Sequence, residues 1–311
     1  MISLVIPIYN EELLIEKLFY RCTQALSTIT EDFEIICVDD GSQDRSLEIL
    51  KSFHKKDTRF KVLVLSRNFG HQAAYTAGLQ HAKGEYIAMM DGDLQDPPEL
   101  LASMHQKLLS EQLDIVHGKR QKRKEQWGKK ALIKLFHFVF KRFSQISDVN
   151  DVGNFSIMNR KALNAFLSLT EKNRYLPGLR FFIGFTQGFV YYDREDRQDG
   201  EAKMSTLKLI NLALDAIFSF SDLPIKICLY TGLIGMILFF FAGLYTLISK
   251  IIGIAIIGWS SILLSLYFLG SIQLLFMGIL GEYVFRIYKE TQQRPIFIVK
   301  EFYSEERNYN N

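Results

Sequence analysis

The run Tyr86-Ile-Ala-Met-Met90 leads directly into Asp91-Gly-Asp-Leu-Gln-Asp-Pro-Pro98, so that a short apolar segment ends in an acidic turn. A short apolar run bounded by Gly and Pro is typical of a buried β-strand. The same pattern recurs along the first half of the chain, with amphipathic helical patterns between the runs. The expected strands are Leu4–Ile6, Phe33–Val38, Val62–Leu65, Tyr86–Met90 and Ile115–Val116, and the expected helices are Glu11–Leu26, Arg45–Phe53, His71–His81 and Pro98–Leu109.

Strands that alternate with helices predict an α/β domain whose sheet is mostly parallel and carries helices on both faces. Ligands of such sheets bind beyond the carboxyl ends of the strands, so the residues after each strand are the first candidates for function. Those residues are polar and often acidic here. They are Pro7-Ile-Tyr-Asn-Glu11, Asp39-Asp-Gly-Ser42 with Asp44, Ser66-Arg-Asn-Phe-Gly70, and the segment after Met90.

The acids at these positions favour a cation and a nucleotide. Clustered carboxylates raise one another's pKa unless a cation or a hydrogen-bonding ligand offsets their charge. Asp91 and Asp93, one residue apart, suit a hard divalent ion shared with a nucleotide diphosphate, which predicts Mg²⁺ or Mn²⁺. Each acidic turn alone also fits ordinary turn or helix-cap chemistry, but three of them in one sheet do not. The glycine-rich motifs of dinucleotide-binding proteins and of P-loop proteins are absent from the sequence.

Composition limits the other functional classes. The chain has 311 residues, about two domains, and 48% of them are hydrophobic, so a large core is available. Its net charge of +3 comes from 37 basic and 34 acidic residues, a balance too even for a general nucleic-acid binder. Cys22, Cys37 and Cys228 show no metal or disulfide spacing. The first residues do not form a secretory signal, so a cytoplasmic, reducing location is expected for the first half.

The second half contains two long uncharged stretches, 227–249 and 251–281. About 20 apolar residues cross a bilayer as a helix, which predicts two spans near 227–248 and 259–281. A buried helical hairpin in a soluble domain fits less well, because Leu238–Phe241 and Ile262–Leu264 are apolar all round. Basic residues precede the first span and follow the second, so we expect the first half and both termini to lie in the cytoplasm and the protein to be a multi-pass protein of the inner membrane. These basic residues are Lys208, Lys226, Arg286, Lys289, Arg294 and Lys300.

The expected organisation therefore has four parts, namely a cytoplasmic domain (1–205), a juxtamembrane helix (206–226), a membrane hairpin (227–281) and a cytoplasmic tail (282–311). The segment 129–143 mixes aromatic and basic residues at helical spacing, which predicts a helix in the headgroup plane. The segment 207–220 fits such a helix and an ordinary core helix equally. Glycines in the spans permit close helix contacts, so we expect a homo-oligomer. They are Gly232, Gly235, Gly243, Gly270 and Gly278.

Several motifs together resemble a known family. The chain is similar to the inverting family 2 glycosyltransferases of Rossmann-like GT-A fold, and more narrowly to polyprenyl-phosphate glycosyltransferases of the bactoprenol glucosyltransferase and dolichol-phosphate mannose synthase type. The order and spacing of the motifs carry the resemblance, which covers nearly the whole chain. The motifs are Val5–Glu12, Val38–Asp44, Arg67–Gly70 with Ala77–Leu79, Met90–Glu99, Gly281–Glu290 and Arg294–Val299.

The resemblance implies roles for individual residues. Asp91, Asp93 and Gln95 match the family's metal and diphosphate motif, with Asp93 the first choice as metal ligand. Asp151 sits where relatives carry an acidic residue close to the transferred sugar; it is assigned to the active site, as proton acceptor, sugar ligand or turn cap. The nucleoside would be held by Pro7, Tyr9, Glu11 and Asp39 or Asp40, with Arg67 nearby. The processive branch's Q-x-x-R-W box is absent, so transfer of a single sugar is expected.

The acceptor is expected to be a lipid phosphate, which is mostly ionised at neutral pH and needs cations rather than a strong general base. Guanidinium groups bind phosphate in a bidentate manner. The candidates are Arg120, Arg123, Arg197 and Lys203. Lys203 is favoured by the resemblance, although its neighbours Ala202 and Met204 depart from the usual Ser-Lys-Tyr of the family. Among the histidines, His117 stands out because it follows a predicted strand.

The expected reaction is metal-dependent transfer of one glucose from UDP-glucose to polyprenyl phosphate, with inversion, for modification of a cell-envelope glycan. Catalytic roles fall to Asp93, Asp151, Arg120 and Lys203. The alternatives are the same reaction with GDP-mannose or with an N-acetylated or amino sugar, and a membrane scaffold with an inactive nucleotide pocket.

Overall fold

The structure is a computed structural model that describes residues 1–120, 152–172, 174–193 and 258–304, together with separate residues between 230 and 252. The chain forms two compact units. The first comprises 1–134, 146–205 and 295–311, and the second comprises 135–145 and 206–294. Arg123, Asp151, Arg197 and Lys203 lie outside the described residues, as do the predicted interfacial segments 129–143 and 207–220.

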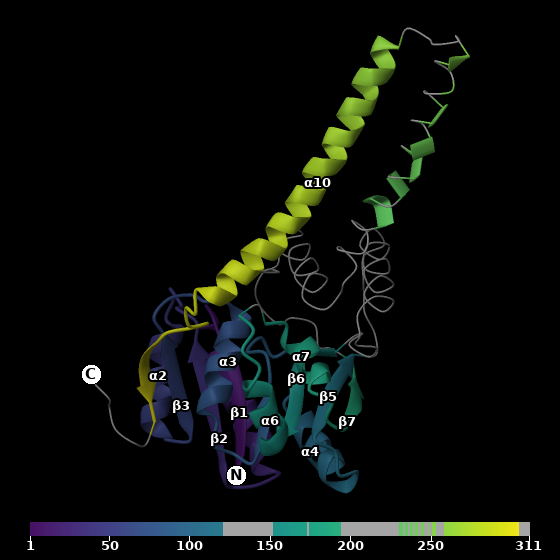
Figure 1. Cartoon of the computed structure of the whole chain (residues 1–311). Coiled ribbons are helices and arrows are strands. Elements are labelled where there is room, and N and C mark those ends of the chain that lie inside the picture. Colours follow the sequence, from purple (N-terminus) through teal and green to yellow (C-terminus); the bar gives the residue numbers. More distant parts are fainter. Residues whose placement is uncertain are drawn as a thin grey trace. The chain divides into compact units, whose positions relative to one another are not determined.

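The first unit is built on one mixed sheet, which in the described part of the chain has the strand order β7-β5-β6-β4-β1-β2-β3-β8 (Figure 1). The strands β4, β1, β2 and β3 pair in parallel, and so do β5 and β7. Only β6 and β8 run antiparallel to their neighbours within this sheet. The mostly parallel α/β sheet predicted from the sequence is therefore confirmed. The strands are β1 (Ile2–Ile8), β2 (Phe33–Asp39), β3 (Phe60–Leu65), β4 (Tyr86–Met89), β5 (Ile115–Arg120), β6 (Val152–Asn159), β7 (Gln187–Tyr192) and β8 (Val299–Tyr303).

Helices cover both faces of the sheet. Helix α1 packs against α2 and α4, and the side chains of Leu4 and Ile6 join their core. Helix α3 packs on β1 and β2, where a Cβ on Gly78 would lie 2.4 Å from a methyl carbon of Val5. Successive strand residues point to opposite faces, so β1 is buried on both sides, as its continuous apolar run requires. The helices are α1 (Ile15–Ser27), α2 (Ser46–Lys56), α3 (His71–His81), α4 (Leu100–Ser110), α6 (Arg160–Leu167) and α7 (Leu176–Phe182).

The five predicted strands and four predicted helices are all present, with shifted ends. The later strands were not predicted. β6 has the mixed sequence Val152-Gly-Asn-Phe-Ser-Ile-Met-Asn159, which shows no clear period, yet it runs between β4 and β5. β8 comes from the predicted C-terminal tail and pairs with β3, and the Ser66 amide donates to the Ile298 carbonyl at 2.9 Å. The tail thus supplies an edge strand of the first unit.

The second unit contains the long helix α10 (Trp259–Thr291). Its 33 residues would measure about 50 Å at 1.5 Å per residue. Within it, Phe268–Thr291 contains an 18-residue window with a mean hydropathy of 1.6 and is, among the described residues, the one helix long and apolar enough to cross a bilayer by length and composition. The helix begins where the second span was predicted but continues past residue 281. The first predicted span falls on a stretch of which only separate residues are described.

A buried carboxylate joins four segments at the amino edge of the sheet. Glu34 is 2% exposed, and its Oε2 lies 2.6 Å from Lys61 Nζ. Its Oε1 accepts hydrogen bonds from the Ser3 hydroxyl and the Lys83 amide. Burial works to raise the pKa of Glu34, but the hydrogen bonds from Lys61, Ser3 and Lys83 outweigh it, so the pKa is lowered. Ionised Glu34 therefore stabilises the folded chain.

We expect Glu34→Gln to reduce the free energy of unfolding of the first unit by about 3 kcal/mol at pH 7, because Lys61 would keep a charge without its partner. Since the folded-state pKa of Glu34 is lowered, its contribution is complete above the unfolded pKa and is lost as the pH falls through the folded one. The difference in melting temperature between variant and wild type should therefore shrink in acid. Exposed Glu85→Gln is the control, and a pH-independent difference would contradict the assignment.

Candidate active site

The turns after β1 and β2 are held together by a series of hydrogen bonds. The Asn10 amide donates to the Ser42 hydroxyl at 3.1 Å, and the Gln43 amide donates back to Asn10 Oδ1 at 2.8 Å. One residue further, the Glu11 amide donates to Ser46 Oγ at 2.9 Å. Ser, Asn and Asp side chains favour such local contacts with backbone amides. The result is one continuous rim at the carboxyl ends of the two strands.

Asp40 extends this rim to the turn after β3. Its two carboxylate oxygens accept hydrogen bonds from the backbone amides of Phe69 at 2.7 Å and Gly70 at 2.9 Å. Gly41 permits the close approach, because a Cβ there would lie 2.7 Å from the Asn68 nitrogen and its φ of +71° favours glycine. Burial raises the pKa of Asp40 against these hydrogen bonds, and it also raises the pKa of Asp39. Asp40 therefore joins the turns after β2 and β3, and the assignment of the nucleoside to Asp39 or Asp40 stays a prediction.

Asp91, after β4, has two partners on helix α3. Oδ1 of Asp91 accepts a hydrogen bond from the Tyr75 hydroxyl at 2.6 Å and lies 3.0 Å from Nε2 of His71. His71 Nε2 also lies 3.2 Å from the Asn154 amide nitrogen of β6. Helix α3 and strand β6 therefore fix the position of the first acid of the acidic turn.

The charges of this cluster support one another. Burial acts to raise the pKa of Asp91, but the hydrogen bond and charge of His71, the Tyr75 hydroxyl and the charge of Arg120 lower it well below its usual range. Burial acts to lower the pKa of His71, but Asp91, Asp93 and Asp40 raise it. Asp91 is therefore ionised at neutral pH, and the described rim carries concentrated negative charge beside a histidine.

The acidic turn offers oxygen ligands of the kind that Mg²⁺ and Mn²⁺ prefer. Asp91, Asp93 and Gln95 would supply two carboxylates and an amide oxygen, and Asp93 Oδ1 accepts the Gln95 backbone amide at 3.2 Å. Within the described ranges, no three His, Cys, Asp or Glu side chains form a complete metal cage. Mg²⁺ is usually held by one or two carboxylates together with substrate phosphates, so the donor set fits such an ion.

Arg120 brings a positive charge to the same edge. It ends strand β5, which runs in the same direction as β4 because β6 is antiparallel to both. Its side chain is 19% exposed, and its Nη2 lies 3.5 Å from Oδ1 of Asp96, which is fully buried. Burial acts to lower the pKa of Arg120, but Asp96, Tyr192 and Asp91 raise it.

The structure thus places the described candidates at one edge of the sheet. Each lies at or just after the carboxyl end of its strand, which follows from the parallel register that pairs Ile8 with Asp39 and Val5 with Met89. Arg67 belongs to this group and stacks on the Phe69 ring, 4.2 Å from its centroid. The full set is Pro7, Tyr9, Glu11, Asp39, Asp40, Arg67, Asp91, Asp93, Gln95 and Arg120. Their individual roles stay predictions.

The histidine at this edge is not the one that the sequence favoured. His117 is fully buried within β5, where its ring stacks on Phe181 and its Nε2 lies 2.8 Å from Gln187 Oε1. Burial and the charge of Arg180 lower its pKa to about 3, so it is a neutral core residue. His71 was missed, although it directly follows the Arg67–Gly70 motif. No local signal distinguished it from a surface residue of an amphipathic helix.

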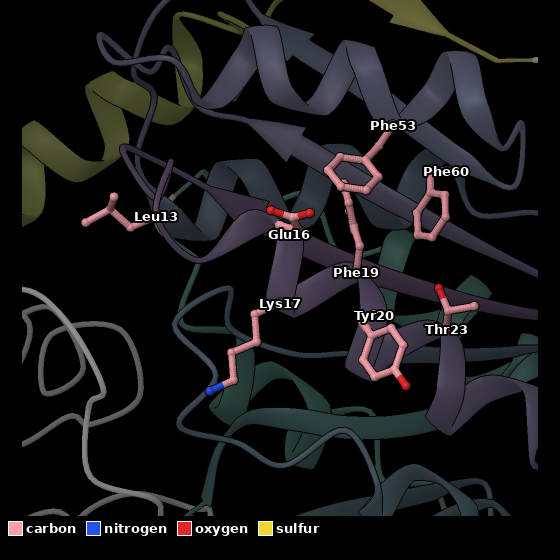
Figure 2. Close-up of a pocket in the computed structure, with 8 residues that line it drawn as sticks. All are labelled: Leu13, Glu16, Lys17, Phe19, Tyr20, Thr23, Phe53 and Phe60. Carbon is pink, nitrogen blue, oxygen red and sulfur yellow. The ribbon is translucent and has the colours of Figure 1, made fainter.

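A surface hollow of about 600 Å³ lies elsewhere on the unit (Figure 2). It is formed by Leu13 and residues of α1 together with Phe53 of α2 and Phe60 of β3, and the rings of Phe19, Phe53 and Phe60 pack together. None of the candidate residues at the carboxyl edge lines this hollow. Its aromatic packing is part of the contact between α1 and α2.

We expect Asp40→Asn to lower the free energy of unfolding of the first unit by about 2 kcal/mol. The single oxygen of the new amide can accept from only one of the two backbone N–H groups, and its NH₂ group would face the other. The measurement is the apparent melting temperature of the purified full-length chain. Asp39→Asn is the matched control, since the hydrogen bonds to Asp39 come from Ser42 and Gly41 of its own turn and do not join a second turn. Equal melting temperatures for Asp40→Asn and wild type would contradict the bridging role.

Known proteins resemble this chain in structure and in sequence. Among solved structures, the chain resembles glucosyl-3-phosphoglycerate synthase from Mycobacterium tuberculosis in complex with Mn²⁺, UDP-glucose and phosphoglyceric acid. That likeness has 17% identity and a TM-score of 0.47, over 70% of this chain and 77% of the other, and is too remote to transfer a ligand. An uncharacterized glycosyltransferase of Synechocystis is 39% identical over 97% of this chain and 95% of its own length.

Two further relatives carry names that state an activity. A prophage bactoprenol glucosyl transferase homolog of Escherichia coli is 35% identical, and the bactoprenol glucosyl transferase of Shigella phage SfX is 34% identical. Each match covers 96% of this chain and 98% of the relative. The model of glycosyl transferase family 2 matches residues 3–167. In sequence order these residues include the strands β1 to β6 and the candidate residues at their carboxyl ends. The chain belongs to glycosyl transferase family 2.

Proposed function

We propose that the protein transfers one glucose from UDP-glucose to the phosphate of a polyprenyl phosphate lipid, with inversion, for modification of a cell-envelope glycan. The observation that carries this proposal is the match to bactoprenol glucosyl transferases over 96% of the chain. The match includes the apolar C-terminal half as well as the first unit, which is called the catalytic unit from here on. A family 2 domain alone would leave the acceptor open. The match along both halves favours an acceptor that resides in a membrane.

The donor nucleotide is assigned to the rim formed by the turns after β1, β2 and β3. Asp40 joins the turns after β2 and β3, and Tyr9, which is 37% exposed, belongs to the turn after β1. The diphosphate is assigned to the acidic turn, where Asp91 is ionised and held by His71 and Tyr75. A negatively charged edge binds a diphosphate only with a cation between them. Asp91, Asp93 and Gln95 would hold Mg²⁺ or Mn²⁺, which when bound relieves charge on the leaving nucleotide as a Lewis acid.

The acceptor phosphate is assigned to the end of β5, where Arg120 lies; this part of the carboxyl edge is called its basic side. Arg120 stands there with its guanidinium anchored by Asp96, and it would orient the attacking oxygen toward the sugar. An ionised phosphate is itself a nucleophile, so no strong general base is required. Arg123, Arg197 and Lys203 are proposed as further cations for this phosphate, and Asp151 as an acid close to the sugar.

A membrane location suits the surface of helix α10. Its apolar side chains are exposed within its own unit, with Leu274 at 71%, Met277 at 68% and Ile262 at 67%. Such a surface is costly in water and stable in lipid. The proposed arrangement is a two-helix hairpin in the inner membrane, with the catalytic domain and both termini in the cytoplasm. Among the described residues, no atom lies within 4 Å of a Cβ built on Gly270 or Gly278, which is compatible with close approach of a second helix and supports the proposed homo-oligomer.

We expect Asp93→Ala to abolish metal-dependent sugar transfer while the melting temperature stays close to that of the wild type, because Asp93 supplies an oxygen ligand rather than packing. Transfer of labelled sugar to extractable lipid is the measurement, with Mg²⁺ or Mn²⁺ present and with a chelator. Exposed Glu48→Ala is the control for the loss of one carboxylate. A scaffold with an inactive pocket predicts no difference, and wild-type transfer by Asp93→Ala would overturn the proposed function.

The donor is tested separately by mass spectrometry of the lipid product after incubation with mixed nucleotide sugars. A hexose added from UDP-glucose supports the proposal. A product made from GDP-mannose, or one carrying an N-acetylated or amino sugar, would replace glucose while keeping the reaction class.

A further inference from the structure

Three side chains from different parts of the catalytic unit form a connected group at the basic side of the edge. Arg120 ends β5, Tyr192 ends β7, and Asp96 belongs to the acidic turn after β4. The parallel register of β5 and β7 pairs Arg120 directly with Tyr192. The Nε–H of Arg120 donates to the Tyr192 hydroxyl at 3.3 Å, and that hydroxyl donates to Oδ1 of Asp96. Nη2 of Arg120 lies 3.5 Å from the same Asp96 oxygen.

These contacts hold one side of the guanidinium. The phenol oxygen of Tyr192 accepts from Arg120 while its single proton goes to Asp96, so both of its hydrogen-bonding functions serve the arginine. A guanidinium carries five N–H donors, more than these two contacts use. Gly153 lies against the same group, since a Cβ there would be 3.1 Å from Nη2 of Arg120. The plane of the guanidinium is therefore set by Tyr192, Asp96 and the backbone of β6.

The ring of Tyr192 is itself fixed by packing. It meets Phe155 edge to face with ring centroids 5.6 Å apart. A Cβ on Gly118 would lie 2.5 Å from the Phe155 ring and 3.0 Å from the Tyr192 ring, so both rings fill the space above that glycine. Burial and the charge of Asp96 raise the pKa of Tyr192, which keeps its hydroxyl protonated as the hydrogen bond to Asp96 requires. Removal of the hydroxyl alone should therefore leave the ring in place.

Fixing an arginine in advance matters for binding a phosphate. Bidentate binding requires the guanidinium plane to match the two oxygens, and a free arginine loses side-chain entropy when it adopts that geometry. Asp96 also offsets the cost of burying the charge, which allows Arg120 to be largely covered and yet remain at the edge. Because Asp96 belongs to the acidic turn, its 3.5 Å contact with Nη2 of Arg120 places the guanidinium beside that turn.

We propose that Tyr192, with Asp96, is a positioning residue that sets the guanidinium of Arg120 to bind a phosphate oxygen of the acceptor lipid. This inference rests on the proposed function, which names that acceptor. It predicts an effect on acceptor binding and none on nucleotide binding.

The test compares Tyr192→Phe with Tyr191→Phe in the purified full-length chain. Tyr191 is the next residue of the same strand, is 56% exposed and is the matched control for loss of a phenol hydroxyl. Equilibrium binding of polyprenyl phosphate and of UDP is measured for each variant, together with the KM for the acceptor and kcat. We expect Tyr192→Phe to weaken acceptor binding about tenfold and to raise the acceptor KM to match, with UDP binding and melting temperature unchanged. Tyr191→Phe should behave as wild type.

A second variant tests the connection to the arginine. Arg120→Lys keeps the positive charge but has no Nε donor for Tyr192. If Tyr192 acts through Arg120, adding Tyr192→Phe to Arg120→Lys should change acceptor binding by less than about twofold, because the contact is already lost. Additive effects would overturn the positioning role. So would unchanged acceptor binding in Tyr192→Phe, or an equal loss of UDP binding.

The binding measurements separate this inference from the proposed function. If wild type binds polyprenyl phosphate but transfers no sugar to it, the proposed reaction fails, and weaker binding by Tyr192→Phe still supports the positioning role. If wild type transfers sugar and Tyr192→Phe binds the acceptor normally, the reaction stands and the positioning role fails.

Discussion

Carboxylates gathered at one end of a parallel sheet repel one another. At the described end of this sheet, hydrogen bonds and an ion pair offset that repulsion. Asp40 directs its charge into two backbone amides, and Asp91 is held by a histidine and a tyrosine of helix α3. Asp96 is buried against Arg120. Each of these three acids thus has partners within the protein, and the pKa of Asp91 is lowered, so the proposed binding of a cation and a phosphate begins from an ordered edge.

The antiparallel strand β6 connects the acidic turn after β4 with the end of β5. Because it runs against both β4 and β5, it allows those two strands to share one direction and brings the end of β5 to the level of the acidic turn. Its first residues also contribute directly, since Asn154 reaches His71 and Gly153 lies against Arg120. The acidic turn after β4 and the arginine at the end of β5 therefore meet at one end of the sheet, as the proposed displacement between two anionic substrates requires.

The strands and helices that the sequence predicted are those whose patterns lie within a few neighbouring residues. The strands β1 to β4 and the helices α1 to α4 were predictable because apolar periodicity and turn residues act within a few positions. Strand β6 has no clear period, and β8 comes from a tail beyond α10, so their places in the sheet depend on pairing with distant segments. The same limit explains the choice of His117, whose stacking against Phe181 and Phe189 was invisible in the sequence.

The amino-acid sequence by itself determined the alternation of strands and helices, the acids at the strand ends and the long apolar segments, since each is written in neighbouring residues. Only the tertiary structure decided which side chains meet. Arg120 and Tyr192 are 72 residues apart, and only the register of β5 and β7 makes them partners. That register comes from the packing of the whole sheet, because shifting a strand by one residue would turn its side chains to the opposite face.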